Sequence, residues 1–317
     1  ILVTGGLGYI GSHTVVELLN NNFEVVIIDD LSNTEKFILK NIEEISGKKP
    51  IFYPFDLKRK ELLKQVFDAH KIEGCIHFAA YKAVGESQEK PIDYYENNLF
   101  SLINLLQEMK ERNISNFIFS SSCTVYGQAD TMPIDENTPL KLPESSYGKT
   151  KQMGEEILKD FATAHQKKVT LLRYFNPIGA HPSAKLGELP IGIPNNLVPY
   201  VMQTAAGVRE KLSVWGNDYP TEDGTAIRDY IYVVDLAKAH VKALQKLISE
   251  NSETLVDIYN LGTGKGSSVL EVVHAFEKAN DVAVPYQICE RRAGDITIAY
   301  ANADKAEKEL GWKSETS

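Results

Sequence analysis

The first twenty residues constrain the fold of this chain more than any other segment. A short apolar run, Ile1–Val3, precedes Gly5, Gly8 and Gly11, and a helix-like pattern follows up to residue 20. Glycine tolerates the sharp turn and the close backbone approach that a bound pyrophosphate requires. The N–H groups at the start of the following helix bind such an anion. The segment therefore predicts a strand, a glycine turn and a helix that together bind a dinucleotide.

The first half of the chain repeats this order of strand and helix. Six short β-rich runs are expected to form strands, at residues 1–3, 25–28, 51–53, 74–78, 116–120 and 169–172. Helix-length amphipathic segments lie between them, near residues 11–20, 36–46, 59–70, 93–112 and 147–165. Alternating βα units favour a parallel sheet with helices on both faces, because the crossovers are right-handed. We therefore predict an α/β fold with a doubly wound parallel sheet (Rossmann).

The composition of the sequence changes after Arg173. Residues 174–225 carry many Pro, Gly and Asn, which predicts irregular structure with long loops. Apolar patterns return at 229–247 and 257–260, and we expect these to rejoin the sheet. The predicted domains are a sheet domain, 1–173 plus 226–262, and a smaller, irregular α/β domain, 174–225 plus 263–317.

Composition argues against several classes of function. The formal net charge is −9, whereas a nucleic-acid-binding surface would be basic. No apolar run reaches the roughly 20 residues that span a bilayer. The histidines and cysteines lack the spacing of metal ligands, so no metal site is expected. Scattered Cys75, Cys123 and Cys289, together with an opening strand in place of a charged leader, predict a cytoplasmic protein.

Asp29 indicates which dinucleotide is bound. It ends the second predicted strand, 18 residues after Gly11. An acid at this place accepts hydrogen bonds from the adenosine ribose and repels a 2′-phosphate, so NAD is favoured over NADP. In the alternative reading, Asp29 or Asp30 only caps the following turn. Asp56, after the third predicted strand, is a further candidate for contact with the adenine.

Tyr147 and Lys151 form a candidate acid–base pair. They are four residues apart at the start of a predicted helix and therefore share one face of it. A free tyrosine has a pKa of about 10, but a lysine ammonium and a nicotinamide cation both favour the phenolate and would lower that pKa. Tyr147 could then exchange a proton with a hydroxyl group. The alternative is a tyrosine that lies beside a lysine on the surface without function.

Ser122 strengthens the catalytic interpretation. It belongs to the run Ser120–Ser122 at the carboxyl end of a predicted parallel strand, where ligands bind in such sheets. Its hydroxyl could orient the same substrate oxygen as Tyr147. Alternatively, Ser122 or Thr124 caps a turn or helix.

The glycine turn, the serine-rich strand end and the Tyr147–Lys151 pair together resemble the extended short-chain dehydrogenase/reductase family. Further motifs resemble one branch of it, the UDP-galactose 4-epimerase family, nearly from end to end. They are Thr4–His13, His77–Ala80, Lys82–Ser87, Phe117–Gly127, Arg173–Gly179, Gly192–Leu197, Gly216–Gly224 and Arg228–Ile231.

The resemblance implies an isomerase that interconverts UDP-galactose and UDP-glucose through a transient 4-keto sugar and bound NADH. It places catalytic roles on Ser122, Tyr147 and Lys151. The same three residues and the following ones are implied as NAD contacts: Gly5, Gly8, Tyr9, Ile10, Gly11, Asp29, Asp30, Leu31, Ser32, Asn33, Thr34, Asp56, Leu57, Phe78, Ala79, Ala80, Tyr81, Lys82, Asn97 and Phe175. Contacts to the UDP-sugar, bound by the smaller domain, would fall on Asn176, Asn196, Leu197, Arg228, Arg292, Asp295 and Ala299. The two arginines suit a diphosphate, although a surface salt bridge is the alternative for either one.

The resemblance also implies a homodimer. The helices predicted at 93–112 and 147–165 would pair across a twofold axis into a four-helix bundle. Leu102, Leu105, Leu106 and Leu158 could line that interface, or could equally be ordinary core residues.

Ala299 departs from the family pattern. Members restricted to hexoses carry a bulky tyrosine at this place, and members that accept N-acetylated sugars carry a small residue. We therefore expect activity on UDP-GlcNAc and UDP-GalNAc as well. The alternative is that the neighbouring Tyr300 swings into the space.

Two other functions remain as alternatives. A related NDP-sugar epimerase or 4,6-dehydratase has the same fold, but the dehydratases carry an Asp-Glu pair where this chain has Cys123 and Thr124. A non-catalytic NAD-binding regulator would be expected to lack the catalytic residues, and Ser122, Tyr147 and Lys151 are all present.

Overall fold

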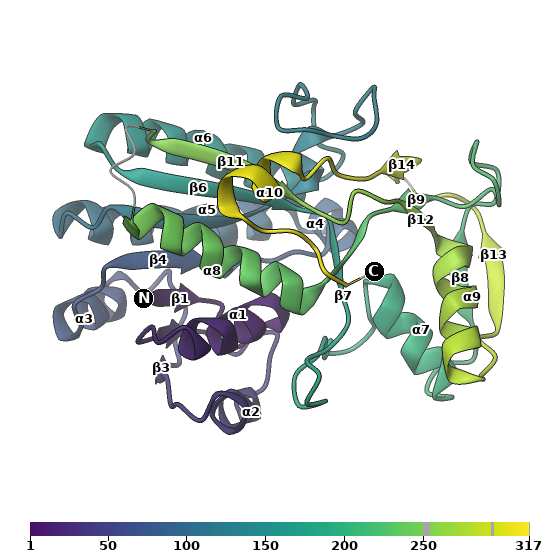
Figure 1. Ribbon diagram of the computed structural model, residues 1–317, viewed down its shortest axis with the longest axis horizontal. Helices are drawn as coiled ribbons and strands as arrows, with labels where there is room; N and C mark the ends of the chain where they lie inside the picture. The colour runs from purple at the N-terminus through teal and green to yellow at the C-terminus, as the bar shows by residue number, and fades with distance from the viewer. Residues whose placement is uncertain (250–253, 293–294, 317) are drawn as a thin grey trace.

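The computed structural model describes residues 1–249, 254–292 and 295–316. Its largest element is a seven-stranded parallel sheet in the order β11-β6-β5-β4-β1-β2-β3 (Figure 1). The strands are β1 Leu2–Thr4, β2 Val26–Ile28, β3 Ile51–Tyr53, β4 Gly74–His77, β5 Asn116–Ser122, β6 Lys168–Tyr174 and β11 Val256–Leu261. The strand order reverses at β1, so the predicted doubly wound sheet is confirmed.

Helices cover both faces of this sheet. They are α1 Tyr9–Asn20, α2 Phe37–Ser46, α3 Lys60–Ala69, α4 Val84–Glu89, α5 Pro91–Glu111, α6 Ser146–His165 and α8 Val233–Ser249. Apolar side chains of α1, α2 and α8 pack into one core, and those of α3, α5 and α6 pack into a second. Successive side chains of a strand point to opposite faces of the sheet, so Val3 and Ile27 face the first core, whereas Leu2 faces the second. A buried parallel sheet needs apolar side chains on both faces, which explains the continuous apolar runs in the sequence.

The four leucines that could have lined a dimer interface lie in the interior. Leu102, Leu105 and Leu106 of α5 and Leu158 of α6 are buried in the core between these helices and the sheet. They are therefore ordinary core residues, and a dimer interface would have to use other side chains.

A smaller lobe follows β6 and lies on the right in Figure 1. Its elements are β7 Asn176–Ile178, α7 Leu197–Ala205, β8 Leu212–Trp215, β9 Ile227–Arg228, β10 Tyr230–Tyr232, β12 Ser267–Ser268, α9 Val269–Asn280, β13 Tyr286–Cys289 and β14 Ile298–Ala299. They form three small sheets, β10-β7, β12-β9-β14 and β13-β8. A separate apolar cluster that includes Val201, Val214 and Val273 holds α7 and α9 against β8.

The last helix, α10 Asp304–Leu310, returns to the large sheet. Ala306, Leu310 and Trp312 pack into the same core as α1 and α8. The Trp312 indole N–H donates to the backbone oxygen of Asp235 at 2.8 Å. Within the described ranges, no helix has the length and apolar character that crossing a membrane would require.

Candidate active site

The glycine turn between β1 and α1 is too tight for side chains. Gly5 has a φ of 67°, and its N–H donates to the backbone oxygen of Ile28 at 2.8 Å. A Cβ atom on Gly11 would lie 2.2 Å from the backbone oxygen of Gly5. Gly8 caps α1 with its backbone alone, which leaves the first N–H groups of the helix facing the turn. This turn has the shape that a pyrophosphate requires.

Asp29 holds the glycine turn from the end of β2. Its buried carboxylate accepts the N–H of Leu7 at 3.0 Å and the N–H of Leu31 at 3.0 Å. Burial raises the pKa of this carboxyl group, and the backbone hydrogen bonds oppose that rise. Asp30 is exposed and accepts from the Ser32 N–H at 2.9 Å. Asp30 therefore caps the turn, which was the alternative to a contact with the cofactor. Asp29 also caps the turn, in a place next to the expected ribose.

The other predicted cofactor residues gather at the carboxyl ends of the strands. Asp56 and Leu57 follow β3, Phe78–Lys82 follow β4, and Phe175 follows β6. Thr34 donates to the backbone oxygen of Leu7 at 2.7 Å and ties the loop after β2 to the glycine turn. The remaining members, Tyr9, Ile10, Leu31, Ser32, Asn33 and Asn97, lie at the start of α1, in the loop after β2 and in α5.

Tyr147 lies at the start of α6, whose first turn is capped by Ser145. The Ser145 hydroxyl accepts the Gly148 N–H at 3.1 Å. Gly154, further along α6, lets the helix approach β5, because a Cβ atom there would lie 2.8 Å from the Phe119 ring. This approach brings the half-buried phenol of Tyr147 close to Ser122 at the end of β5, where Ser122 acts to lower the pKa of the phenol. Ser122 also caps the short 3-10 helix η1, Cys123–Tyr126, by accepting the Thr124 N–H at 3.2 Å.

Lys151 lies one turn after Tyr147 and is buried. Its Nζ donates to the backbone oxygen of Ser120 at 2.6 Å and lies 5.8 Å from the centre of the Tyr147 ring. Burial lowers the pKa of Lys151 to about 7. Burial also raises the pKa of Tyr147 to about 12, and the hydrogen bond from Ser122 opposes that rise.

The predicted lowering of the Tyr147 pKa by Lys151 is therefore wrong for the protein groups by themselves. The physical reason is desolvation, which disfavours the charged form of both side chains. A phenolate at neutral pH would need a further positive charge at this place.

Arg228, Arg292 and Asp295 come together in the smaller lobe. The Arg292 guanidinium donates to Asp295 through Nε at 3.0 Å and Nη2 at 3.2 Å. Arg228 Nη2 lies 4.0 Å from the same carboxylate. The salt bridge that was the alternative for these arginines is thus present in the structure. Arg228 also lies near Cys123, where its charge opposes the burial that raises the pKa of that thiol, so the arginine group borders the catalytic residues.

Sequence reasoning missed Tyr219, which lies beside these arginines. Its hydroxyl is buried and makes no hydrogen bond within the described part of the chain. The charges of Arg228, Arg291 and Arg292 act to lower its pKa, against burial and Asp295. Buried hydroxyls normally have a partner, so this one fits a bound acceptor such as a phosphate oxygen. Tyr219 lies within the quoted motif Gly216–Gly224, but nothing in its spacing marked it.

Sequence reasoning also missed Glu188, which joins the two groups of predicted ligands. Its Oε1 accepts from Asn196 at 2.5 Å and lies 3.2 Å from the Lys82 Nζ. Lys82 belongs to the predicted cofactor set, and Asn196, the cap residue of α7, belongs to the predicted substrate set. Leu197 follows it as the first residue of α7, and Asn176 begins β7.

Ala299 is buried in a small cluster with Val125 and Phe175. It pairs with Arg228 in the β14–β9 ladder, which places it next to the arginine group. The Tyr300 ring lies 3.4 Å from where a Cβ on Gly266 would be. The alternative that Tyr300 swings into the space beside Ala299 stays a prediction.

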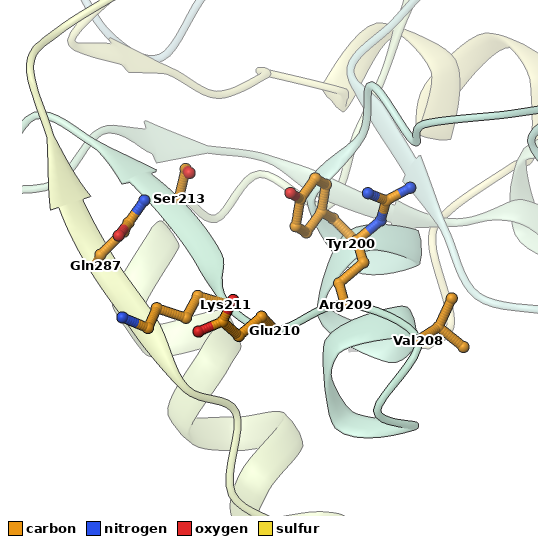
Figure 2. Close-up of a pocket in the computed structure, with 7 residues that line it drawn as sticks. All are labelled: Tyr200, Val208, Arg209, Glu210, Lys211, Ser213 and Gln287. Carbon is orange, nitrogen blue, oxygen red and sulfur yellow. The ribbon is translucent and has the colours of Figure 1, made fainter.

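A surface cavity of the smaller lobe lies apart from the catalytic residues. It has a volume of about 460 Å³ and is lined by Tyr200, Val208, Arg209, Glu210, Lys211, Ser213 and Gln287 (Figure 2). The Arg209 guanidinium lies 4.8 Å from the centre of the Tyr200 ring and donates to Gln203 at 2.7 Å. This cavity contains none of the predicted site residues.

The fold and the site together define an extended short-chain dehydrogenase/reductase. A family model described as GDP-mannose 4,6 dehydratase matches residues 2–317. The UDP-glucose 4-epimerase of Bacillus subtilis (strain 168) is 54% identical over 315 residues, which cover 99% of this chain and 92% of that relative.

Solved structures agree with this relationship. A UDP-glucose 4-epimerase from Bifidobacterium longum, in complex with NAD+ and UDP, is 50% identical with a TM-score of 0.96 and covers 100% of this chain and 93% of its own. The UDP-Glc/GlcNAc 4-epimerase from Campylobacter jejuni is 35% identical with a TM-score of 0.85 and covers 99% and 94%. The chain belongs to the UDP-glucose 4-epimerase family, within the larger family that the GDP-mannose 4,6 dehydratase model describes.

Proposed function

We propose that this chain is a UDP-glucose 4-epimerase that interconverts UDP-galactose and UDP-glucose with bound NAD. One observation carries the proposal. The Ser122 hydroxyl lies close enough to the Tyr147 phenol to lower its pKa, and Lys151 lies one helical turn away, at the carboxyl edge of a dinucleotide-binding sheet. Relatives that share half of the sequence over nearly its full length have this activity in their names.

The residues around the glycine turn fit NAD. Gly5 and Gly11 leave no room for side chains, the N–H groups at the start of α1 face the turn, and Asp29 lies beside it to accept ribose hydroxyls. The chemistry that NAD supplies when bound is reversible acceptance of a hydride. The oxidised nicotinamide ring also carries a positive charge, which would lower the pKa of Tyr147 that burial has raised.

Tyr147 is the proposed proton acceptor at the sugar O4. As phenolate it takes that proton, and Ser122 donates a hydrogen bond to the same oxygen. Lys151 favours the phenolate by its charge, from its position against the Tyr147 ring. With the O4 proton on Tyr147 and the C4 hydride accepted by bound NAD, the sugar would be a 4-keto sugar. Return of the hydride to the opposite face of C4, and of the proton from Tyr147 to O4, would give the epimer.

The arginine group is the proposed clamp for the diphosphate. Arg228 and Arg292 would exchange their contacts with Asp295 for phosphate oxygens, and the Tyr219 hydroxyl would gain a partner there. Asn176, Asn196 and Leu197 would contact the sugar and the uridine. The clamp holds the diphosphate while the keto sugar turns, so the sugar pocket itself has to stay roomy.

Replacing Tyr147 tests the proposal. Tyr147→Phe should lower kcat for UDP-galactose by at least about 10²–10⁴-fold, because the proton acceptor is lost, while the fold is kept. Tyr286→Phe, which removes an exposed hydroxyl on β13, is the control and should leave kcat unchanged. Turnover of Tyr147→Phe near the wild-type rate would remove Tyr147 from the mechanism.

We propose that the enzyme also epimerises UDP-GlcNAc and UDP-GalNAc. The support is the small side chain of Ala299, which is paired with Arg228 of the arginine group. A methyl group in this place leaves space for an N-acetyl group that a phenol ring would fill.

A 4,6-dehydratase is less well supported, although the matching family model carries that description. Elimination of the C6 hydroxyl needs an acid–base pair near the catalytic serine. The segment after Ser122 is Cys123, Thr124 and Val125, and none of these is a carboxylate. The remaining alternative, a non-catalytic NAD-binding regulator, does not explain why the complete Ser122, Tyr147 and Lys151 group is kept.

We also propose a homodimer in the cytoplasm. Phe100 and Ile103 on α5 and Met153 on α6 are exposed, and α5 and α6 pack together against the sheet. A second copy of these two helices would cover all three side chains. Phe100→Glu should then give a monomer in sedimentation, and an unchanged dimer would contradict this interface. The three free thiols suit a reducing compartment.

A further inference from the structure

Glu155 extends the row of functional side chains on α6. Tyr147, Lys151 and Glu155 are each four residues apart and therefore share one face of the helix. The first two act in the proposed reaction, whereas Glu155 has no part in it. Its side chain is completely buried between α6 and the strands β5 and β6.

Arg173 of β6 neutralises this buried carboxylate. Its Nε donates to Glu155 Oε1 at 2.8 Å, and its Nη2 donates to Oε2. The Tyr126 hydroxyl fixes the other side of the guanidinium, 3.0 Å from Nη1. Such a pair adds little net stability, because the loss of hydration offsets the attraction between the charges. A role beyond stability would explain why the Glu155–Arg173 ion pair is buried between α6 and the sheet.

Lys151 and Glu155 on α6 hydrogen-bond to two consecutive residues of β5. Lys151 donates to the backbone oxygen of Ser120 at 2.6 Å, and Glu155 accepts from the Ser121 hydroxyl at 2.6 Å. Ser122, the next residue, meets the Tyr147 phenol. The two anchors therefore fix the register between helix and strand on which the contact between Ser122 and Tyr147 depends.

Glu155 also acts on the Lys151 ammonium through its negative charge, from one helical turn further along α6. Burial lowers the pKa of Lys151, and Glu155 is the group that opposes this effect. The other titratable groups around Lys151 are Tyr147 on α6, His77 on β4 and Tyr174 on β6. In the protein without cofactor, burial lowers the pKa of His77, which favours the neutral ring, and raises the pKa values of both tyrosines, which favours their neutral hydroxyls. The Tyr147 phenolate forms only in the proposed reaction.

We propose that Glu155 is a positioning residue of the epimerase site: it anchors Ser121 and keeps Lys151 protonated beside Tyr147, while Arg173 holds its carboxylate in place. The inference rests on the proposed function for the roles of Tyr147 and Lys151. Glu155 itself touches neither substrate nor cofactor, so its loss should lower kcat and leave KM nearly unchanged.

The test uses a variant that keeps the buried charge balanced. Glu155→Gln alone leaves Arg173 unpaired and endangers folding, so Glu155→Gln is combined with Arg173→Gln. With UDP-galactose, the alkaline limb of the kcat–pH profile should move to lower pH and the acid limb to higher pH. The kcat at neutral pH should fall about tenfold or more. Glu108→Gln on α5, which breaks a similar pair with Arg112, is the matched control and should leave the profile unchanged.

Ser121→Ala keeps the Glu155–Arg173 pair and removes one anchor, so it remains informative if the double variant does not fold. It should lower kcat with both limbs of the profile unmoved. An independent readout is NMR of the lysine side chains, in which the Lys151 pKa should be lower in the double variant. A wild-type profile together with an unchanged kcat in either folded variant overturns the inference. Failure of the wild type to turn over UDP-galactose would instead refute the proposed function, and the NMR titration would then decide on Glu155 alone.

Discussion

At the residue scale, burial is the dominant influence on the chemistry of this site. Lys151 is buried and Tyr147 is half-buried, and the loss of hydration makes each side chain resist its charged form. The sequence predicts their adjacency, because a spacing of four residues on a helix is a local property. It does not predict their pKa values, because those depend on β4, β5 and β6, which the chain brings around Lys151 from distant positions.

Ala299 carries the sharpest prediction at this scale. Ala299→Tyr should abolish turnover of UDP-GlcNAc, because the ring fills the space proposed for the N-acetyl group. Turnover of UDP-galactose should stay within about threefold of wild type, since the catalytic residues are untouched. A coupled assay with both substrates checks this. If the wild type has no activity on UDP-GlcNAc, the proposed second substrate is wrong. Equal activity of variant and wild type would show that residue 299 does not set the choice of sugar.

Contacts between residues in distant loops could not be predicted from the sequence. Glu188 contacts Lys82 across 106 positions of the chain, and the buried hydroxyl of Tyr219 gains its meaning only beside Arg228 and Arg292. No spacing rule connects such positions. Glu155 had a local signal, because it continues the row of Tyr147 and Lys151 by one further step of four residues.

At the scale of elements, the strands and helices of the large sheet were predictable and the smaller lobe was not. Long amphipathic helices and buried apolar strands have a clear periodicity. The strands β9, β12 and β14 have two residues each, which is too short for any pattern. The residue boundaries of the two domains stay a prediction.

The glycine turn is the element whose geometry allows the least change. Gly11→Ala would place a Cβ atom 2.2 Å from the Gly5 backbone oxygen and should displace the turn. NAD that copurifies with the protein should then fall at least about tenfold, since the turn no longer fits a pyrophosphate. Absorbance of the released cofactor measures this. Gly85→Ala on α4, where a Cβ would meet nothing within 4 Å, is the control. Wild-type NAD content in Gly11→Ala would mean that the turn does not bind the cofactor.

At the scale of the whole molecule, buried histidines make stability depend on pH. Burial lowers the pKa of His240 to about 4, whereas an unfolded histidine has a pKa of about 6.5. Between these values the unfolded chain binds a proton that the folded chain does not, so stability falls as pH falls from 6.5 towards 4. His13 and His77 are shifted in the same direction.

His240→Asn removes one of these titrations. In this pH window the free energy of unfolding should fall with decreasing pH by about 1.4 kcal/mol per pH unit less than in the wild type. Urea denaturation at a series of pH values measures the two slopes. Parallel slopes would show that His240 is already charged in the folded protein.

In the proposed reaction, one site removes a hydride from the sugar C4 and returns the same hydride to the other face. UDP-galactose that carries deuterium at C4 tests this most directly, with mass spectrometry of the product and no added cofactor. UDP-glucose should form with the deuterium still at C4. Loss of the deuterium to solvent, or conversion only with stoichiometric added NAD, would contradict it.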